Sequence, residues 1–352
     1  MKFVCLSLAM VFMVISIVSA LEKKREEVST QALYEQGMQL RMQGKEKEAV
    51  EYFDKALAID STNLLAWGYK GAALNMSERL FEAISAYDSA LKLDKDCIFA
   101  IAGKALALRK LGGKSEVAAG YPINVKERRY ALKKLGVRSG AEILSESETL
   151  FNHAIALKPK ENDAFDYLGR GLAYRMQGKF ELAIADYNTA IKLNPQDAFA
   201  YQQRGTAYIE QRKYYELAIE DFNNALKLYP KYVVAYNNRG YVYTNLGKYD
   251  LAISDYTKAI EINPHFAESI YYRGETYAVK GKYDLAIVDY NTALKINPQN
   301  ILAYLGRGAV YYFIKDYKSA KRDWAKAVEL DPNGPVGQRA RDNLKRLSNM
   351  GS

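Results

Sequence analysis

The residues best suited to catalysis are few and far apart in this chain. His153 and His265 are the only histidines, and no His-Glu-x-x-His zinc motif contains either of them. Lone histidines of this kind are usually structural. The run 112–115 reads Gly-Gly-Lys-Ser, which ends like a phosphate-binding loop but lacks its earlier glycine spacing and flanking strand. We therefore predict no catalytic residue, metal site or cofactor, and expect a protein that is not an enzyme and has no small-molecule substrate.

A basic stretch at residues 110–140 is the strongest charge feature. It holds eight basic residues against two acidic ones, whereas the whole chain has 50 Lys and Arg against 41 Asp and Glu, a formal net charge of +9. Its candidate anion-binding patch consists of Lys126, Arg128, Arg129, Lys133, Lys134 and Arg138. Such a patch suits an anionic membrane or envelope surface, or an acidic partner. The alternative is a solvated face, or an extra helical hairpin packed on the rest of the chain.

The elements that carry these residues are helices, as the stretch 233–266 shows. Small and aromatic residues recur there at three- and four-residue spacing, in a first helix at Tyr236, Gly240 and Tyr243 and in a second at Ala252, Tyr256 and Ala259. Gly247 marks the end of the first helix, where a left-handed conformation is needed, and Pro264 follows the second. Two helices of about a dozen residues cannot cover their own apolar faces, so the unit needs neighbours.

The same pattern recurs at residues 267–300 and 301–334, a period of 34 residues. Its large residue, Gly and Tyr on helix A, Ala, aromatic and Ala on helix B, and closing Pro resemble the tetratricopeptide repeat family. The resemblance implies an all-α fold, a right-handed α-solenoid of stacked helix-turn-helix repeats. A repeat array grows by stacking, so 352 residues need not mean two domains.

The pattern divides the chain into a series of segments. Residues 30–109 hold repeats 1 and 2 and helix A of repeat 3, residues 110–140 are an insertion, and residues 141–161 are helix B of repeat 3. Repeats 4 to 8 occupy residues 164–334. Residues 335–347 mix basic and apolar residues and predict a capping helix, followed by a tail at 348–352.

One recurrence is not required by the repeat pattern. In repeats 4 to 8 an arginine precedes the helix A glycine and an aspartate precedes the helix B aromatic, and both are missing from the first two repeats. Their joint presence predicts contact, as in Arg239 with Asp255 and Arg273 with Asp289. We interpret these pairs as structural ties between helices A and B; a functional ladder of charges is the alternative.

The resemblance also implies a binding groove, because helix A supplies the concave surface in that family. The corresponding positions here are Gln202, Gln203, Thr206, Asn237, Asn238, Tyr241, Thr244, Asn245, Tyr271, Tyr272, Glu275, Tyr312 and Phe313. Amides and phenols suit a groove that hydrogen-bonds an extended protein or peptide partner. Some members hold a terminal carboxylate with Lys, Asn and Arg, but Gln202 and Thr206 replace the first two, which disfavours that ligand.

The first residues differ in kind from the repeats. Residues 1–20 combine Lys2, an uncharged apolar run and small residues before Ala20, which predicts a cleaved secretory signal, followed by a charged linker at 21–29. The alternative is a membrane anchor formed by residues 3–21. Removing Cys5 with the signal leaves Cys97 alone, which excludes an internal disulfide in the mature chain.

These features together predict an exported, non-enzymatic scaffold that binds a protein or peptide in the concave groove of the solenoid. An alternative is an adaptor at an envelope or membrane surface that uses residues 110–140 for its main contact. Nucleic acid is not an expected partner, because the signal directs the protein away from it.

Overall fold

The computed structural model describes residues 29–113, 130, 133–134, 136 and 139–349, and every regular element within them is an α-helix. After a first helix at residues 29–42, the helices are α2 (Glu46–Ile59), α3 (Leu64–Met76), α4 (Leu80–Leu93), α5 (Ile98–Gly112), α7 (Gly140–Ala156), α8 (Ala164–Met176), α9 (Phe180–Leu193), α10 (Ala198–Glu210), α11 (Tyr215–Leu228), α12 (Val233–Asn245), α13 (Tyr249–Ile262), α14 (Ala267–Val279), α15 (Tyr283–Ile296), α16 (Ile301–Phe313), α17 (Tyr317–Leu330) and α18 (Pro335–Asn349).

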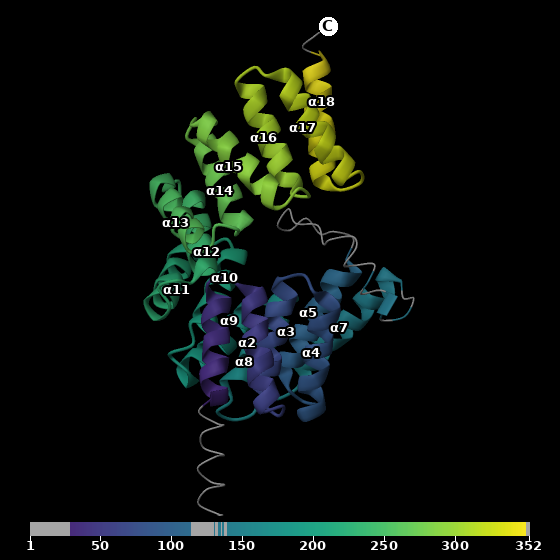
Figure 1. The fold of residues 1–352 in the computed structure, drawn as a ribbon, viewed down its shortest axis with the longest axis vertical. Coiled ribbons are helices and arrows are strands. Elements are labelled where there is room, and N and C mark those ends of the chain that lie inside the picture. Colours follow the sequence, from purple (N-terminus) through teal and green to yellow (C-terminus); the bar gives the residue numbers. More distant parts are fainter. Residues whose placement is uncertain (1–28, 114–129, 131–132, 135, 137–138, 350–352) are drawn as a thin grey trace, which may run out of the picture.

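Consecutive helices pack as antiparallel pairs, and the pairs stack into a curved solenoid (Figure 1). The pairs that follow the first are α3 with α4, α5 with α7, α8 with α9, α10 with α11, α12 with α13, α14 with α15, and α16 with α17. The predicted all-α solenoid is therefore confirmed. Helix α7 supplies the second helix of repeat 3, so the insertion lies inside that repeat.

The short turn between the two helices of a pair, present in every repeat except the third, depends on one backbone conformation. Gly247 has φ of +72°, as expected for a residue that ends a helix in the left-handed region. Glu78 and Lys315 occupy the corresponding place in repeats 2 and 8 with φ of 62° and 66°, a conformation that costs a residue with a side chain about 1 kcal/mol. The turn is thus fixed by the fold even where glycine is missing.

Every pair except α5 with α7, where Ala105 takes the place of the glycine, is held by an aromatic ring of helix B against a glycine of helix A. A Cβ atom on Gly240 would lie 2.8 Å from the ring of Tyr256, so only glycine permits the observed approach. Tyr256, Ala252 and Ala259 are fully buried in this contact. Most of the tyrosines singled out by the repeat pattern therefore serve packing.

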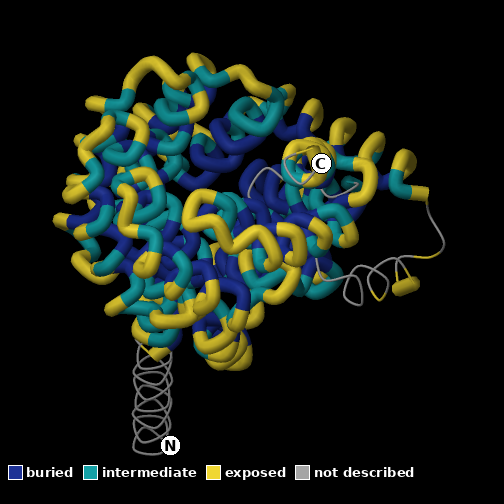
Figure 2. Tube along the Cα trace, turned by 90° about the horizontal axis from the view of Figure 1, so that it is seen from above, coloured by how far each residue is buried: buried dark blue, intermediate teal, exposed yellow. Residues whose placement is uncertain are grey.

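The concave faces of the first repeats meet across the superhelix axis and bury an aromatic cluster. Tyr69 of α3 lies with its ring centroid 5.5 Å from Phe99 of α5, 5.6 Å from Phe165 of α8 and 6.2 Å from Phe199 of α10. The guanidinium of Arg41, in the first helix, lies over the rings of Tyr69 and Phe199. Figure 2 shows this buried interior surrounded by more exposed backbone. We call Tyr69, Phe99, Phe165 and Phe199 the axial cluster.

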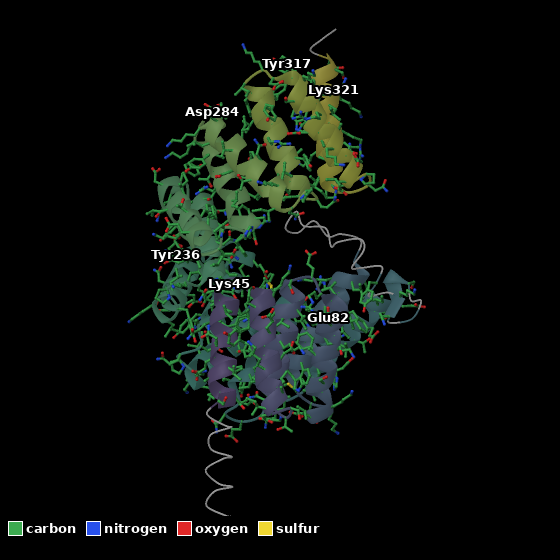
Figure 3. The ribbon with its side chains drawn as sticks, in the orientation of Figure 1. Lys45, Glu82, Tyr236, Asp284, Tyr317 and Lys321 are labelled. Carbon is green, nitrogen blue, oxygen red and sulfur yellow. The ribbon has the colours of Figure 1, made fainter. Side chains whose placement is uncertain are left out.

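The first repeat also contacts the sixth, more than two hundred residues later in the sequence. Asn263, after α13, donates a hydrogen bond from its side-chain nitrogen to the carbonyl oxygen of Gly44 at 3.1 Å. Figure 3 shows Lys45, next to Gly44, on the side of the first repeats nearest Tyr236 of α12. The solenoid therefore closes one turn on itself before α14 begins.

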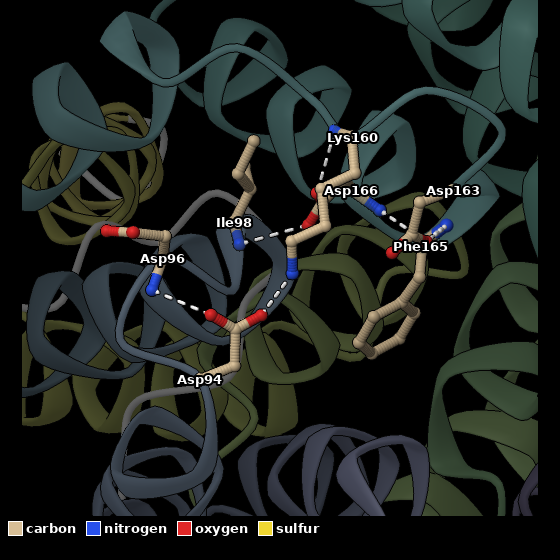
Figure 4. A network of polar contacts seen from close by, with 7 residues as sticks. All are labelled: Asp94, Asp96, Ile98, Lys160, Asp163, Phe165 and Asp166. Atoms are coloured by element: carbon tan, nitrogen blue, oxygen red, sulfur yellow. Dashed lines mark hydrogen bonds and ion pairs between the residues drawn. The ribbon is translucent and has the colours of Figure 1, made fainter.

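A polar network ties the insertion-bearing repeat to its neighbours (Figure 4). The carboxylate of Asp166 accepts hydrogen bonds from the backbone nitrogens of Ile98 at 3.3 Å and Lys160 at 3.1 Å. The ammonium group of Lys160 pairs in turn with Asp94. Asp163 caps α8 by accepting a hydrogen bond from Phe165. The network joins the loops before α5 and α8.

The last helix, α18, packs on α17 with Val336, Gly337 and Ala340 buried and most of its other residues partly or fully exposed. Such a helix shields the apolar end of the array from water. None of the helices in the described part of the chain has the length and hydrophobicity to cross a membrane. The predicted signal at residues 1–20 lies outside the described residues.

Candidate functional site

The arginines and aspartates that recur in repeats 4 to 8 meet in the structure. Arg239 donates two hydrogen bonds to the carboxylate of Asp255, both at 2.7 Å. Arg273 holds Asp289 in the same way at 2.8 Å, and the other pairs are Arg170 with Asp186, Arg204 with Asp221 and Arg307 with Asp323. Burial raises the pKa of Asp255, partly offset by the hydrogen bonds from Arg239. Each pair joins helix A to helix B of one repeat.

These arginines have a second partner, which the sequence analysis did not predict. Arg239 also donates to the side-chain oxygen of Asn223 at 2.5 Å, on helix B of the preceding repeat. Equivalent contacts run from Arg204 to Asn188, from Arg273 to Thr257 and from Arg307 to Asn291. Recurrence of Asn or Thr just after the helix B aromatic was the available signal. The arginines therefore tie neighbouring repeats together as well as the two helices of one repeat.

Repeats 2 and 3 use a different pair in the same place. Lys70 of α3 contacts Asp54 of α2 at 2.5 Å, and Lys104 of α5 contacts Asp88 of α4 at 2.6 Å. The aspartates stand where the later repeats carry Asn or Thr. These pairs join consecutive repeats only, with the side chains of Asp54 and Asp88 52% and 43% exposed.

Two of the predicted groove amides are buried and form hydrogen bonds within the protein. Gln202 is 6% exposed and donates to the Thr206 hydroxyl at 2.9 Å. Asn237 is 2% exposed and accepts from the Ser269 hydroxyl at 2.8 Å. The Asn237 bond links α12 to α14, the Gln202 bond lies within α10, and neither side chain is available to a partner.

The neighbouring groove residues are partly accessible. Asn238 donates to Thr206 at 3.4 Å, linking α12 to α10. The Thr244 hydroxyl lies 3.3 Å from those of Tyr256 and Thr276, so it links α12 to α13 and α14. The remaining predicted groove residues of repeats 5 and 6 are half-buried or exposed: Gln203, Tyr241 and Asn245. These polar side chains line a face that is already cross-linked by hydrogen bonds.

The predicted groove residues of repeats 7 and 8 surround an open pocket. Its volume is about 460 Å³, and it is formed by α14, α15, α16 and α18. The lining includes Tyr271, Glu275, Leu302, Leu305, Phe313 and Arg339. Phe313 is 65% exposed, and its ring stacks parallel to that of Tyr283 with centroids 6.1 Å apart. We call this the C-terminal pocket.

Other predicted residues flank this pocket. Tyr272 contacts Tyr271, with ring centroids 5.1 Å apart, and Tyr312 contacts Phe313 at 6.1 Å. Tyr312 also packs on Trp324 of α17, so its ring is anchored in the core of repeat 8. The residues around Phe313 thus form an aromatic rim, in which Tyr312 is fixed by its contact with Trp324.

An acidic group forms part of the pocket wall. Glu275 of α14 accepts a hydrogen bond from the hydroxyl of Tyr290 on α15. Burial raises the pKa of Glu275, partly offset by the Tyr290 hydrogen bond and by the charge of Arg339. Within the described residues this carboxylate forms no salt bridge, and the one positive charge that lowers its pKa is that of Arg339, which acts on it without a hydrogen bond. The pocket therefore combines apolar walls with a carboxylate that has no direct counter-charge there.

Family comparisons agree with this architecture. Sequence models described as tetratricopeptide repeat or TPR repeat match residues 30–63, 171–212, 200–232, 233–266, 255–288, 274–313 and 301–333. Together they cover more than half of the chain. The chain belongs to the tetratricopeptide repeat family. TPR repeats form scaffolds for protein interaction, and membership of the family supports this general role for the chain without naming a partner. A comparison with curated protein sequences gives no match.

Solved TPR structures share the fold. The chain matches Cut9 in the APC/C hetero-tetramer Cut9-Hcn1 with 18% identity and a TM-score of 0.64, over 92% of this chain and 58% of that one. It also matches YrrB, described as a TPR protein with an unusual peptide-binding site, with 23% identity and a TM-score of 0.42 over 55% of this chain and 97% of YrrB. MamA from Desulfovibrio magneticus RS-1 matches with 22% identity and a TM-score of 0.44 over 49% of this chain and 97% of MamA. The first match supports the solenoid over most of the TPR chain.

Most of the predicted basic patch cannot be placed on this TPR scaffold. Lys126, Arg128, Arg129 and Arg138 lie outside the described residues. Lys133 and Lys134 are exposed, and the Lys134 ammonium lies 5.8 Å from the ring centroid of Tyr130.

The residues best suited to catalysis remain dispersed on the TPR array. His153 and His265 are both exposed, on α7 and in the turn before α14. Cys97 is 1% exposed, and burial raises the pKa of its thiol to about 12, which keeps it protonated at neutral pH. The described residues contain no group of three His, Cys, Asp or Glu side chains that could hold a metal ion.

Proposed function

We propose that the protein is a scaffold that binds a protein or peptide segment in the C-terminal pocket. The observation that carries this proposal is the contrast along the concave face. The axial cluster occupies much of that face in the first repeats, where the pocket beside Tyr69 and Phe165 has a volume of about 300 Å³. Helices α14, α16 and α18 leave a larger pocket of about 460 Å³ with an exposed phenylalanine at its edge. Pockets of this size, apolar with a few polar groups, are typical binding sites.

The accessible polar side chains of α12 extend the proposed site. Asn238, Tyr241 and Asn245 lie on helix A of repeat 6, beside the helix that carries Glu275. Tyr241 touches Tyr272 with ring centroids 5.6 Å apart, which makes the surface continuous. An extended peptide could hydrogen-bond to these side chains while one of its residues enters the pocket.

We further propose that the protein acts after export. The support is the sequence of residues 1–20, with its early lysine, apolar run and small residues before the charged linker. Sequencing the N-terminus of the protein recovered from the cell envelope of the producing organism tests this. An N-terminus at Leu21 is expected, and an intact Met1 would contradict cleavage.

A peptide library displayed on phage tests the binding site directly. We expect peptides enriched on the full chain to bind it in solution, as measured by fluorescence anisotropy. Ala309→Trp fills the pocket wall and should weaken their binding at least tenfold. Val288→Trp is the matched control, because Val288 is 58% exposed on α15 and does not line the pocket.

Circular dichroism melting should show that both tryptophan variants remain folded. Equal peptide affinity of Ala309→Trp and the wild type would contradict the proposed site. Failure to enrich any peptide on the full chain would contradict a peptide-binding function.

A further inference from the structure

The carboxylate of Glu275 is an unusual group for the concave face of this chain. The same helix position carries Thr206 in repeat 5, Tyr241 in repeat 6 and Ala309 in repeat 8, none of which bears a charge. Placing a carboxylate among Tyr271, Leu305 and other apolar groups costs free energy unless a partner compensates it. The packing of repeats does not require this residue.

A glycine on the neighbouring helix leaves space for the carboxylate of Glu275. Gly306 of α16 faces it, and a Cβ there would lie 2.5 Å from Oε1 of Glu275 and 2.8 Å from the Tyr290 hydroxyl. A side chain at position 306 would therefore displace the pair. Tyr290 fixes Oε1 by its hydrogen bond, and Glu275 lines the open pocket.

We propose that the C-terminal pocket takes a lysine or arginine side chain of the bound partner, with its charged end at Glu275. This inference rests on the proposed function and specifies the chemistry of its partner. The walls support it, because Leu302 and Leu305 can cover the aliphatic stem of a basic side chain, and the exposed ring of Phe313 adds an electron-rich face.

Arg339 stands at the edge of the pocket and makes the charge preference testable. It is exposed on α18, and its charge acts on Glu275 over a longer range than an ion pair. A basic partner residue would meet repulsion from Arg339 and attraction to Glu275. An acidic partner would meet the reverse, so substitutions of the two residues have opposite effects for the two kinds of partner.

The test uses the full chain and three fluorescein-labelled peptide pools with randomised flanking residues. The fixed central residue is lysine, glutamate or norleucine, which has the stem of lysine without its charge. We expect the lysine pool to bind the wild type at least tenfold more tightly than the norleucine pool, and the glutamate pool to bind most weakly. Glu275→Gln should remove the preference for lysine over norleucine.

Two further variants separate the pocket from general electrostatics. Glu268→Gln removes the same charge from the same helix outside the pocket lining and should keep the lysine preference. Arg339→Gln should strengthen binding of the lysine pool by about two- to threefold. Circular dichroism melting of each variant checks that the fold is kept.

The outcomes separate this inference from the proposed function. If the pools bind equally and Ala309→Trp weakens all of them, the pocket binds peptides but the inference of a basic residue is wrong. A glutamate preference that is lost in Arg339→Gln would also overturn it. If no pool binds the wild type, the proposed function itself fails.

Discussion

The concave face is buried in the first repeats of this solenoid and exposed in the last repeats. In the first, helices A converge on the superhelix axis and bury Tyr69 to 4% exposure. In the last, α14, α16 and α18 leave a pocket and expose Phe313 to 65%. A residue on the concave side of a TPR helix can therefore be buried in a core or exposed on the surface, depending on how tightly the repeats curve.

The second residue of helix A differs between the two regions. It is Phe99, Phe165 and Phe199 in repeats 3 to 5, and these rings pack against one another or against Tyr69. In repeat 7 it is Glu268, and burial raises the pKa of its carboxyl group, partly offset by a hydrogen bond with Asn237.

Loss of the axial cluster should have the largest effect. We expect Tyr69→Ala to lower the free energy of unfolding by about 3–5 kcal/mol, because it removes a ring that contacts four others. Phe313→Ala, in the open region, should change it by less than about 0.5 kcal/mol. Urea unfolding followed by circular dichroism measures both. Similar losses in the two variants would mean that the two regions are equally packed.

Hydrogen exchange sharpens the same experiment, since a repeat array need not unfold in one step. In Tyr69→Ala the amides of α3, α5 and α8 should exchange faster while those of α16 keep their protection. Uniform loss of protection would show that the two regions unfold as one unit.

Glu46, close to Arg41 beside the axial cluster, is a buried acid whose titration should affect stability. Burial raises the pKa of Glu46 to about 7, partly offset by Arg41 and Lys110. A carboxyl group whose pKa is higher in the folded state binds more protons there, so stability falls as pH rises from about 4.5 to 7. We expect Glu46→Gln to remove a loss of about 3 kcal/mol across this range.

Urea unfolding at intervals between pH 4.5 and 8 measures the difference between Glu46→Gln and the wild type. Glu48→Gln is the control, because Glu48 is exposed in the same first turn of α2. A gain in stability for Glu46→Gln that does not grow with pH would contradict the burial of an ionised Glu46.

The ladder of ion pairs gives a third comparison. Arg239→Ala should cost about 2–3 kcal/mol, because it leaves Asp255, 5% exposed, without its partner. Lys70→Ala should cost about 0.5 kcal/mol, because the Asp54 side chain stays 52% exposed. Double-mutant cycles with Asp255→Ala and Asp54→Ala isolate each pair. A coupling for Arg239 and Asp255 no larger than that for Lys70 and Asp54 would contradict the structural role of the arginines.

The fold could be predicted from the sequence because the same local pattern occurs in every repeat. Tyr236, Gly240 and Tyr256 recur in equivalent places, and each recurrence supports the same helix pair. The contact of Arg239 with Asp255 was predictable for the same reason, since both residues appear and disappear together. Local periodicity thus determines the helices, their pairing and the ties between them.

Curvature could not be predicted in the same way, because it is the sum of small rotations between repeats. Gln202 and Gln203 occupy adjacent groove positions, yet Gln202 is buried and Gln203 is partly accessible. The contact of Asn263 with Gly44 joins residues that no repeat pattern relates. Which concave residues face a partner is therefore a property of the assembled superhelix.

Two glycines at the sixth position of helix A give the smallest and most direct comparison. A Cβ on Gly169 of α8 would lie 2.4 Å from backbone atoms of Phe99, whereas one on Gly306 of α16 would meet the ends of the Glu275 and Tyr290 side chains. Backbone cannot yield without moving a helix, so Gly169→Ala should lose about 2 kcal/mol. In Gly306→Ala the gain of about 1 kcal/mol in helix propensity offsets the movement of two side-chain ends, so the change should stay below about 0.5 kcal/mol.

Thermal and urea unfolding measure both variants. Equal losses would mean that α14 and α16 are as tightly apposed as α5 and α8, and the distinction between a filled axis and an open pocket would fail.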